Sequence, residues 1–330
     1  MDPARVERHL PGIWRYRHAF NLFAGAPLVS LGEGNTPLVW ENVDGHEVGL
    51  KLESLNPSGS FKDRGTTVLV SQLLSRGVRE AVEDSSGNAG ASFAAYAARA
   101  GIKSRVFVPE AASGPKRMQI ASYGAELVSV PGPRSAAAQA VLQAVGQGSV
   151  YASHAYLPFG LAGIATIAYE LYETIGWVPG SIVAPVGQGS LLLGLMRGFA
   201  ALQAAGRIDK PPFYLGVQAL ACAPIVAAFG QGSKVAVEVN EDPTVAEGVR
   251  VRNPVCAAAL LNEISEGQGV FYAVEEEAIL PAYRELAERG FLVEPTSAIV
   301  WSALKRFRNS LPEPVILILS GSGLKYQPKN

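Results

Sequence analysis

A single lysine, Lys62, stands in the segment NPSGSFKDRG (56–65), between a turn rich in Gly, Ser and Pro and the start of a predicted helix. The dipole and the free N–H groups of a helix favour anions at this end, so a cation there needs another reason. A lysine that is partly dehydrated in such a place has a lowered pKa and can act as a nucleophile or a base. The segment therefore indicates an amine that does covalent or proton-transfer chemistry.

Three further turns could bind anions: DSSGNAG (84–90), PVGQGSLLLG (185–194) and SGSG (320–323). Each follows a predicted strand, and the first two lead into a predicted helix, whose free backbone N–H groups can bind phosphate or carboxylate. Each could equally be a structural turn or a helix cap. PVGQGS is not a Walker loop, because no Gly-Lys-Ser/Thr follows it, and the third glycine of a dinucleotide fingerprint is misplaced. Together with one lysine, these turns suit a phosphorylated aromatic aldehyde.

Short runs of β-forming residues alternate with Ala-rich helical stretches from about residue 48 onward. Alternating βα units predict an α/β fold with a mostly parallel sheet, helices on both faces, and ligands beyond the carboxyl ends of the strands. The predicted helical stretches include 66–77, 88–101 and 135–146. The predicted strands are 48–54, 80–85, 104–109, 125–130, 149–153, 181–186, 213–219, 269–274 and 314–320.

Composition narrows the class of protein. The 330 residues are 48% hydrophobic and 17% charged, which suits a large buried core, and the net charge of −1 argues against nucleic-acid binding. The sequence shows no apolar core of a signal peptide and no apolar run of about 18 residues that would span a membrane. Cys222 and Cys256 lack metal-ligand spacing, so we expect reduced core cysteines and no metal site. These features predict a cytoplasmic α/β protein.

The motifs SFKDRG, SSGNAG, PVGQGS and SGSGLK resemble, in order and spacing, those of the fold-type II pyridoxal-phosphate (PLP) enzymes. The resemblance implies PLP as cofactor and a two-lobed, three-layer αβα architecture like that of tryptophan synthase β. It also implies a larger PLP-binding lobe (1–59 and 151–330) and a smaller mobile lobe (60–150). Within this group the chain is similar to threonine synthase from WRYR (14–17) to its end, through the segments LGEGNTPL (31–38), AAYAARAG (94–101), TVAEGVRV (244–251) and VEPTSA (293–298).

The resemblance assigns the cofactor-binding residues. Lys62 corresponds to the Schiff-base lysine and the catalytic base, and Asn88 to the asparagine that binds the PLP 3′-oxygen. Ser320 stands where the family has a hydroxyl that faces the pyridine nitrogen. A hydroxyl there leaves the ring largely neutral, which suits elimination and replacement at Cβ or Cγ more than transamination. The phosphate loop corresponds to Gly187, Gln188, Gly189 and Ser190.

The substrate site departs from the threonine synthase pattern. The resemblance places the substrate α-carboxylate on the loop that contains Ser85, Ser86 and Ala89, where Ala89 replaces a threonine of many relatives. Threonine synthases hold the phosphate of O-phosphohomoserine with a cation, but the corresponding segment 151–166 has no Arg or Lys. His154 and Lys116 are therefore candidate substrate-binding residues. Either could equally be structural, as a satisfied histidine or a solvated helix charge.

The resemblance implies a PLP-dependent lyase acting at Cβ or Cγ of a small-molecule amino acid. A threonine synthase-like reaction would convert O-phosphohomoserine and water to threonine and phosphate. The uncharged pocket leaves open a serine/threonine ammonia-lyase, a β-replacement enzyme of the cysteine synthase type, and a PLP-fold binding protein without turnover. Fold-type II enzymes are usually homodimers, so we expect a homodimer and neither a nucleic acid nor a membrane as partner.

Overall fold

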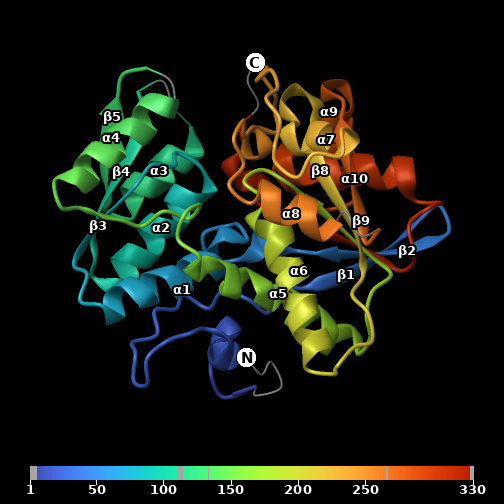
Figure 1. Ribbon diagram of the computed structural model, residues 1–330, viewed down its shortest axis with the longest axis horizontal. Helices are drawn as coiled ribbons and strands as arrows, with labels where there is room; N and C mark the ends of the chain where they lie inside the picture. The colour runs from blue at the N-terminus through green and yellow to red at the C-terminus, as the bar shows by residue number, and fades with distance from the viewer. Residues whose placement is uncertain (1–5, 111–113, 133, 265–266, 328–330) are drawn as a thin grey trace.

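The computed structural model of the chain describes residues 6–110, 114–132, 134–264 and 267–327. Two sheets lie side by side, each between layers of helices (Figure 1). The predicted strands and helices are present, and the two-lobed, three-layer α/β fold is confirmed. The sequence analysis missed β1 (Leu38–Val43), an edge strand in which only one residue is fully buried and the apolar signal is weak.

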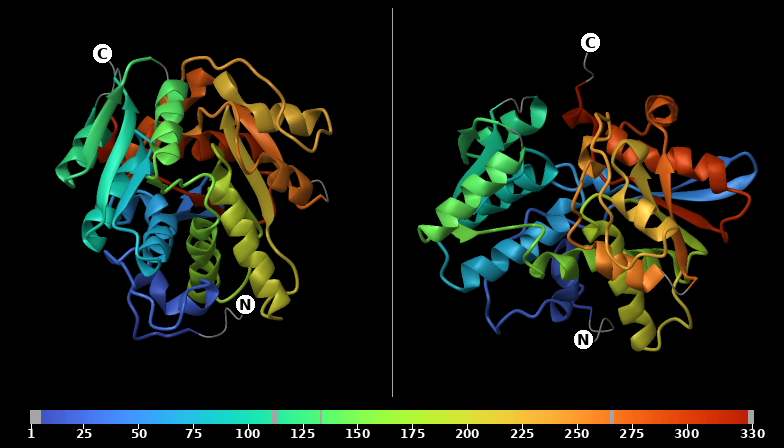
Figure 2. Two further views of the ribbon diagram at one scale, coloured as in Figure 1. Left: turned by 60° about the vertical axis from the view of Figure 1, so that its left-hand side comes forward. Right: turned by 45° about the horizontal axis from the view of Figure 1, so that its top comes forward.

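The larger sheet has the strand order β1-β2-β10-β7-β8-β9. β1 and β2 form an antiparallel hairpin, and all other neighbours are parallel, as the βα alternation predicts. The hairpin projects at the edge of the lobe beside the chain that follows the last helix (Figure 2). The strands after β1 are β2 (His46–Lys51), β7 (Ser181–Pro185), β8 (Phe213–Ala219), β9 (Gly269–Val274) and β10 (Val315–Ile318).

Helices cover both faces of the larger sheet because its central strands are apolar on both sides. Ile182 and Ala184 of β7 pack into one core, and Val183 between them packs into the other. The first core lies under α5 (Phe159–Ile175), α6 (Ser190–Ala204), α7 (Pro224–Gly230) and α8 (Ala257–Ile264). The second lies under α9 (Glu276–Glu288) and α10 (Pro295–Phe307).

The smaller sheet has the order β5-β4-β3-β6, and all its neighbours are parallel. Val106 of β4 faces the helices of one side, and Phe107 faces those of the other. The strands are β3 (Glu80–Glu83), β4 (Lys103–Pro109), β5 (Glu126–Val130) and β6 (Val150–Tyr151). The first side carries α1 (Lys62–Ser75), α2 (Asn88–Ala100) and α3 (Pro115–Ser122), and the second carries α4 (Arg134–Gly146).

The chain passes from the larger sheet to the smaller one after β2 and returns at β7. The predicted lobe boundaries, 1–59 with 151–330 and 60–150, and the mobility of the smaller lobe stay predictions. Short 3₁₀ helices connect the main elements. They are η1 (Gly12–Ala19), η2 (Glu53–Leu55), η3 (Leu220–Cys222), η4 (Glu247–Val249) and η5 (Gly323–Lys325).

Helix α1 joins the two lobes, since it packs against α2 on one side and α5 on the other. Its approach to α5 is very close at Gly163, where an added Cβ would lie 1.9 Å from the carbonyl oxygen of Arg64. A side chain at this position would force the helices apart. The contact therefore fixes the distance between α1 and α5 and brings the start of α1 against the larger lobe.

A buried ionic network fixes the rotation of α1 about its own axis. The Arg64 guanidinium donates two hydrogen bonds to Glu53, at 2.7 and 2.8 Å, and two to Glu170, at 2.8 and 2.7 Å. Lys51 Nζ lies 3.0 Å from Glu170 Oε2 and 2.7 Å from the carbonyl oxygen of Thr36. Burial alone would raise the pKa of Glu170, but Arg64 and Lys51 outweigh it and hold that pKa below its ordinary value. Two cations and two anions therefore balance within the protein.

We predict that Arg64→Met lowers the free energy of unfolding by about 3–5 kcal/mol, because Glu53 and Glu170 would remain buried without a guanidinium partner. Urea denaturation measures the change. Arg197→Met is the matched control, since Arg197 pairs with Glu263 at 2.9 Å but its side chain is 60% exposed. The control should change the free energy by no more than about 1 kcal/mol. Equal losses in the two variants would contradict a special role for the buried network.

Candidate active site

Lys62 is the first residue of α1, and its turn is tied down by the next side chain. Asp63 is fully buried, and its carboxylate accepts a hydrogen bond from Ser58 N at 2.6 Å and one from Ser92 Oγ at 2.6 Å. These contacts join the 56–61 turn to α2. They supply the anion that the start of α1 favours, so the cation beside it is left to a different task.

The environment of Lys62 makes its amine partly neutral. Burial lowers the pKa of Lys62 to about 8, although Glu83 and Glu294 favour the charged form. The Nζ atom lies 4.8 Å from the centre of the Phe61 ring, which shields one side of it. A pKa near 8 leaves a useful fraction of free amine at neutral pH, as a nucleophile or a general base requires.

Ser320 lies at the end of β10, directly against the start of α1. Its carbonyl oxygen accepts a hydrogen bond from Phe61 N at 3.0 Å, and its Oγ lies 3.0 Å from Ser297 Oγ. Ser297 Oγ in turn accepts a hydrogen bond from Gly321 N at 2.8 Å. The Ser320 hydroxyl is therefore buried and held in place, and the backbone of Ser320 lies against the residue before Lys62.

Asn88 and Glu294 bring the two lobes together. Asn88 begins α2 of the smaller lobe, and its Nδ2 donates a hydrogen bond of 2.7 Å to Oε1 of Glu294, which precedes α10 of the larger lobe. Asn88 Oδ1 is buried and has no partner in the described part of the chain. Gly321 allows this approach, since an added Cβ there would lie 2.2 Å from Glu294 Oε1. Asn88 is thus an amide with one end unsatisfied beside the Lys62 turn.

The 187–190 loop ends β7 and starts α6. Gly189 has a φ of +92°, a left-handed conformation that favours glycine, and an added Cβ there would lie 2.9 Å from Cys256 Cβ. Gln188 is engaged with the 254–256 turn, because its backbone oxygen accepts a hydrogen bond from Cys256 N at 3.0 Å. The N–H groups of the first turn of α6, which begins at Ser190, have no partners within the helix and can bind an anion.

These groups fit PLP. Lys62 offers an amine for the aldehyde, the 187–190 loop offers helix N–H groups for the phosphate, and Ser320 offers a hydroxyl for the ring nitrogen. Asn88 Nδ2 gives one of its two hydrogens to Glu294, so the other can be donated to the 3′-oxygen of PLP, and the buried Oδ1 has no partner among the described residues.

The loop predicted to receive the substrate carboxylate is packed tightly at one end. Ser85 and Ala89 are buried and Ser86 is partly exposed. Ser85 Oγ accepts a hydrogen bond from Gly87 N at 3.2 Å, and an added Cβ at Gly90 would lie 1.8 Å from the Ser85 carbonyl oxygen. The loop therefore has a fixed backbone, and its substrate-binding role stays a prediction.

The two candidate substrate-binding residues Lys116 and His154 both contact acids. Lys116 Nζ lies 2.7 Å from Glu294 Oε2, on the carboxylate that also holds Asn88. His154 Nδ1 lies 2.6 Å from Glu83 Oε1. The sequence analysis placed neither Glu83 nor Glu294 in the site, and Glu83 lies at the end of what the pattern predicts as an ordinary strand. The signal that could have found Glu83 is its place just before the SSGN turn.

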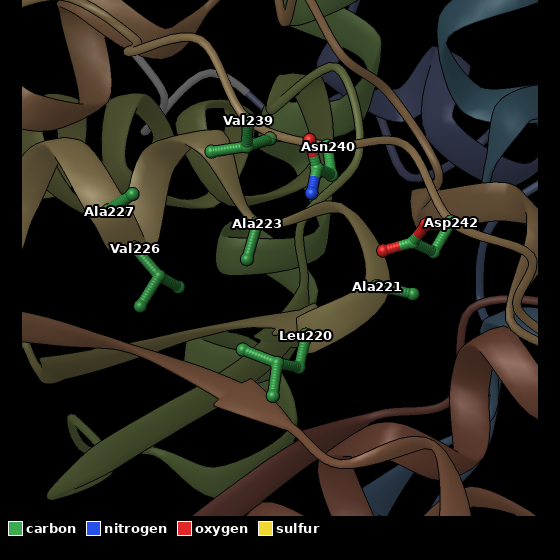
Figure 3. Close-up of a pocket in the computed structure, with 8 residues that line it drawn as sticks. All are labelled: Leu220, Ala221, Ala223, Val226, Ala227, Val239, Asn240 and Asp242. Atoms are coloured by element: carbon green, nitrogen blue, oxygen red, sulfur yellow. The ribbon is translucent and has the colours of Figure 1, made fainter.

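Other features of the described residues do not compete with this site. A surface hollow beside η3 and α7 is lined by Leu220, Ala221, Ala223, Val226, Ala227, Val239, Asn240 and Asp242 (Figure 3). None of the predicted site residues lines it. Among the described residues, no group of three or more His, Cys, Asp or Glu is placed to hold a metal ion. No helix within the described ranges is long and apolar enough to cross a membrane.

Comparison with known proteins places this geometry in context. The family described as "Pyridoxal-phosphate dependent enzyme" matches residues 29–321. The threonine synthase of Methanocaldococcus jannaschii is 36% identical over 95% of this chain and 80% of its own length. The threonine synthase of Mycobacterium bovis is 32% identical over 98% of this chain and 91% of its own length.

Solved structures share the same architecture. The threonine deaminase of T.th. is similar with a TM-score of 0.77 and 28% identity, covering 89% of this chain and 94% of that one. Maize serine racemase is similar with a TM-score of 0.78 over 87% of this chain and 88% of that one. Its identity is 21%, so this second similarity shows the fold alone.

We predict that labelling of Lys62 by acetic anhydride, in protein freed of cofactor, rises through a midpoint near pH 8. The free amine reacts and the ammonium does not, so labelling increases with pH and reports the lowered pKa. Peptide mass spectrometry quantifies it, with Nα-acetyl-lysine amide, whose pKa is about 10.4, in the same solution as a reference. A midpoint for Lys62 equal to that of the reference would show that the site does not lower its pKa.

Proposed function

Because the chain belongs to the family of pyridoxal-phosphate dependent enzymes, we propose that it is a lyase of the threonine synthase type acting at Cβ or Cγ of an amino acid. It would convert O-phosphohomoserine and water to threonine and phosphate. The observation that carries the proposal is the assembly of a partly neutral lysine, a buried hydroxyl and an unsatisfied amide at one place. Support comes from a threonine synthase that is 36% identical over 95% of the chain.

In this proposal Lys62 holds the aldehyde of PLP, the 187–190 loop holds its phosphate, Asn88 its 3′-oxygen and Ser320 its ring nitrogen. When bound, PLP supplies an electron-withdrawing ring that takes up negative charge from the substrate α-carbon. The Lys62 amine is the base suited to removing the α-proton, because its pKa of about 8 lies near the working pH. The backbone of the loop containing Ser85, Ser86 and Ala89 holds the substrate carboxylate.

A second candidate, a serine/threonine ammonia-lyase, is favoured by the charges around Lys62. Glu83 is fully buried beside His154, and burial lowers the pKa of His154 to about 3, so the imidazole offers no positive charge to a substrate phosphate. Lys116 is engaged with Glu294 at 2.7 Å, and Arg134 lies 3.7 Å from Asp84. A hydroxyl leaving group needs no cation of its own. The same candidate is supported by the 28% identity to a threonine deaminase.

We also propose that the protein is a cytoplasmic homodimer in which residues 60–150 form the smaller, mobile lobe. The pair of sheets joined through α1, with Asn88 and Lys116 contacting Glu294 between them, supports the division into two lobes, whereas the dimer is expected from the resemblance to fold-type II enzymes. Light scattering of the purified protein tests the dimer, and a monomeric mass would contradict it.

We predict that the PLP-loaded enzyme releases phosphate from O-phosphohomoserine and forms threonine in equal amount. Lys62→Ala should lose both this activity and the visible absorption band of the lysine-bound cofactor. Phosphate assay and amino-acid analysis measure the products, with Lys103→Ala, at the exposed first residue of β4, as the matched control.

The outcomes separate the candidates. Formation of 2-oxo acid from serine or threonine, without phosphate release from O-phosphohomoserine, would replace the first candidate by the second. A visible band that persists in Lys62→Ala, and that borohydride still reduces, would contradict the assignment of Lys62.

A further inference from the structure

We infer that His154 is a catalytic residue that protonates the leaving oxygen of the substrate through its Nε2, and that Glu83 is the positioning residue that supplies the proton through Nδ1. The inference rests on the proposed function, because it concerns the leaving group of a lyase reaction. It identifies a proton source on the substrate side of the site that is distinct from Lys62. It holds for both candidate substrates, since each loses an oxygen from carbon.

The topology of the smaller sheet places the two residues together. β3 and β6 are parallel neighbours, with Val82 opposite Tyr151, and Ala152 N donates a hydrogen bond of 2.8 Å to the carbonyl oxygen of Val82. Glu83 ends β3, and His154 lies just beyond the end of β6. Both side chains therefore stand at the carboxyl edge of the sheet, where α/β proteins bind their ligands.

The contact between the two side chains uses one atom of each. His154 Nδ1 lies 2.6 Å from Glu83 Oε1, and no hydrogen bond to Nε2 is present in the described part of the chain. Glu83 is fully buried, and its Oε2 has no partner among the described residues. The His154 side chain retains 16% exposure. The imidazole is thus held at one nitrogen by a buried acid and can present the other to a ligand.

Burial and the charges around the pair determine which of the two side chains holds its proton. Burial and the charge of Asp84 raise the pKa of Glu83 well above its ordinary value, although Arg134, Lys62 and the backbone N–H of His154 favour its carboxylate. Burial and the Lys62 ammonium lower the pKa of His154 to about 3. The imidazole is therefore neutral at physiological pH, and the proton of the pair resides on the carboxyl group, which donates it to Nδ1. Because Nδ1 accepts this hydrogen bond, the single ring hydrogen of His154 lies on Nε2.

The proton transfer then balances without an imidazolium. As the C–O bond breaks, its electron pair goes to the oxygen, which takes the hydrogen of His154 Nε2. The Glu83 proton moves to Nδ1, so the imidazole stays neutral and Glu83 becomes a carboxylate. The substrate α-proton has meanwhile passed to Lys62. Lys62 lies close enough to Glu83 to act on its charge, and after turnover Lys62 returns a proton to the Glu83 carboxylate.

The inference is tested by comparing, for each variant, the loss of turnover with an oxygen leaving group and with a chloride leaving group. The hydroxyl group of serine leaves as water, after it has gained a proton, whereas chloride leaves from β-chloroalanine without a proton. His154→Gln and Glu83→Gln should each lower the turnover of serine, or of O-phosphohomoserine if that is the substrate, by about 100-fold. Turnover of β-chloroalanine should fall by less than about 5-fold in each variant, within the range of indirect effects.

Glu83→Gln separates proton supply from positioning. The glutamine amide can still donate to Nδ1 and hold the ring, but it has no proton to release. Nitrogen-15 NMR of histidine-labelled, cofactor-free protein should show a neutral His154 with its hydrogen on Nε2 at pH 7, in the wild type and in Glu83→Gln alike. His46→Gln and Glu313→Gln are the matched controls, because His46 Nδ1 contacts Glu313 Oε1 in the same way on the surface.

Each result decides the matter. Equal losses with both leaving groups, or an imidazolium at position 154 at pH 7, would overturn the inference. Loss of serine turnover in the surface controls would also overturn it. A wild-type enzyme that acts on neither an oxygen-leaving substrate nor β-chloroalanine would overturn the proposed lyase function, and the inference with it. Selective loss with the oxygen leaving group, together with the neutral tautomer, supports both.

Discussion

The buried ion pairs of Arg64 set the position on which the rest of the site depends. Arg64 lies two residues after Lys62, and its guanidinium is clamped between Glu53 of η2 and Glu170 of α5, with no exposure of the Arg64 side chain. A planar guanidinium can donate paired hydrogen bonds to a carboxylate in only a narrow range of orientations. The network therefore fixes α1 in rotation as well as in distance. An apolar cluster of the same volume could be equally stable but would not impose this orientation.

Once α1 is fixed, the Lys62 amine stands where the two lobes meet. The larger lobe contributes Ser320, Glu294 and the 187–190 loop, and the smaller lobe contributes Asn88. The Asn88–Glu294 hydrogen bond of 2.7 Å crosses between the lobes. Glu83 and His154 form a second pair of titratable side chains near an amine whose pKa burial lowers to about 8. In the proposed reaction, this arrangement would separate the base that takes the α-proton from the acid that serves the leaving group.

The fold and the turns that lead into α1 and α6 could be predicted from the sequence because their signals are local. Strand–turn–helix patterns identify the 187–190 loop and the turn that ends at Lys62 without knowledge of the tertiary structure. The contact of Glu83 with His154 could not be predicted, since it depends on β3 lying beside β6, and strand order is not encoded in local periodicity. The partners of Arg64, at positions 53 and 170, are likewise distant along the chain.

The site of covalent attachment of PLP tests the role of Lys62 most directly. Lys325 is a demanding alternative, because burial also lowers its pKa to about 8 and its Nζ lies 2.8 Å from the carbonyl oxygen of Ser58, in the same turn that leads to Lys62. Borohydride reduction of the PLP-loaded protein, followed by peptide mass spectrometry, identifies the modified lysine. We predict a phosphopyridoxyl group on Lys62 alone. Modification of Lys325 or Lys116, or of no lysine, would contradict the assignment of Lys62.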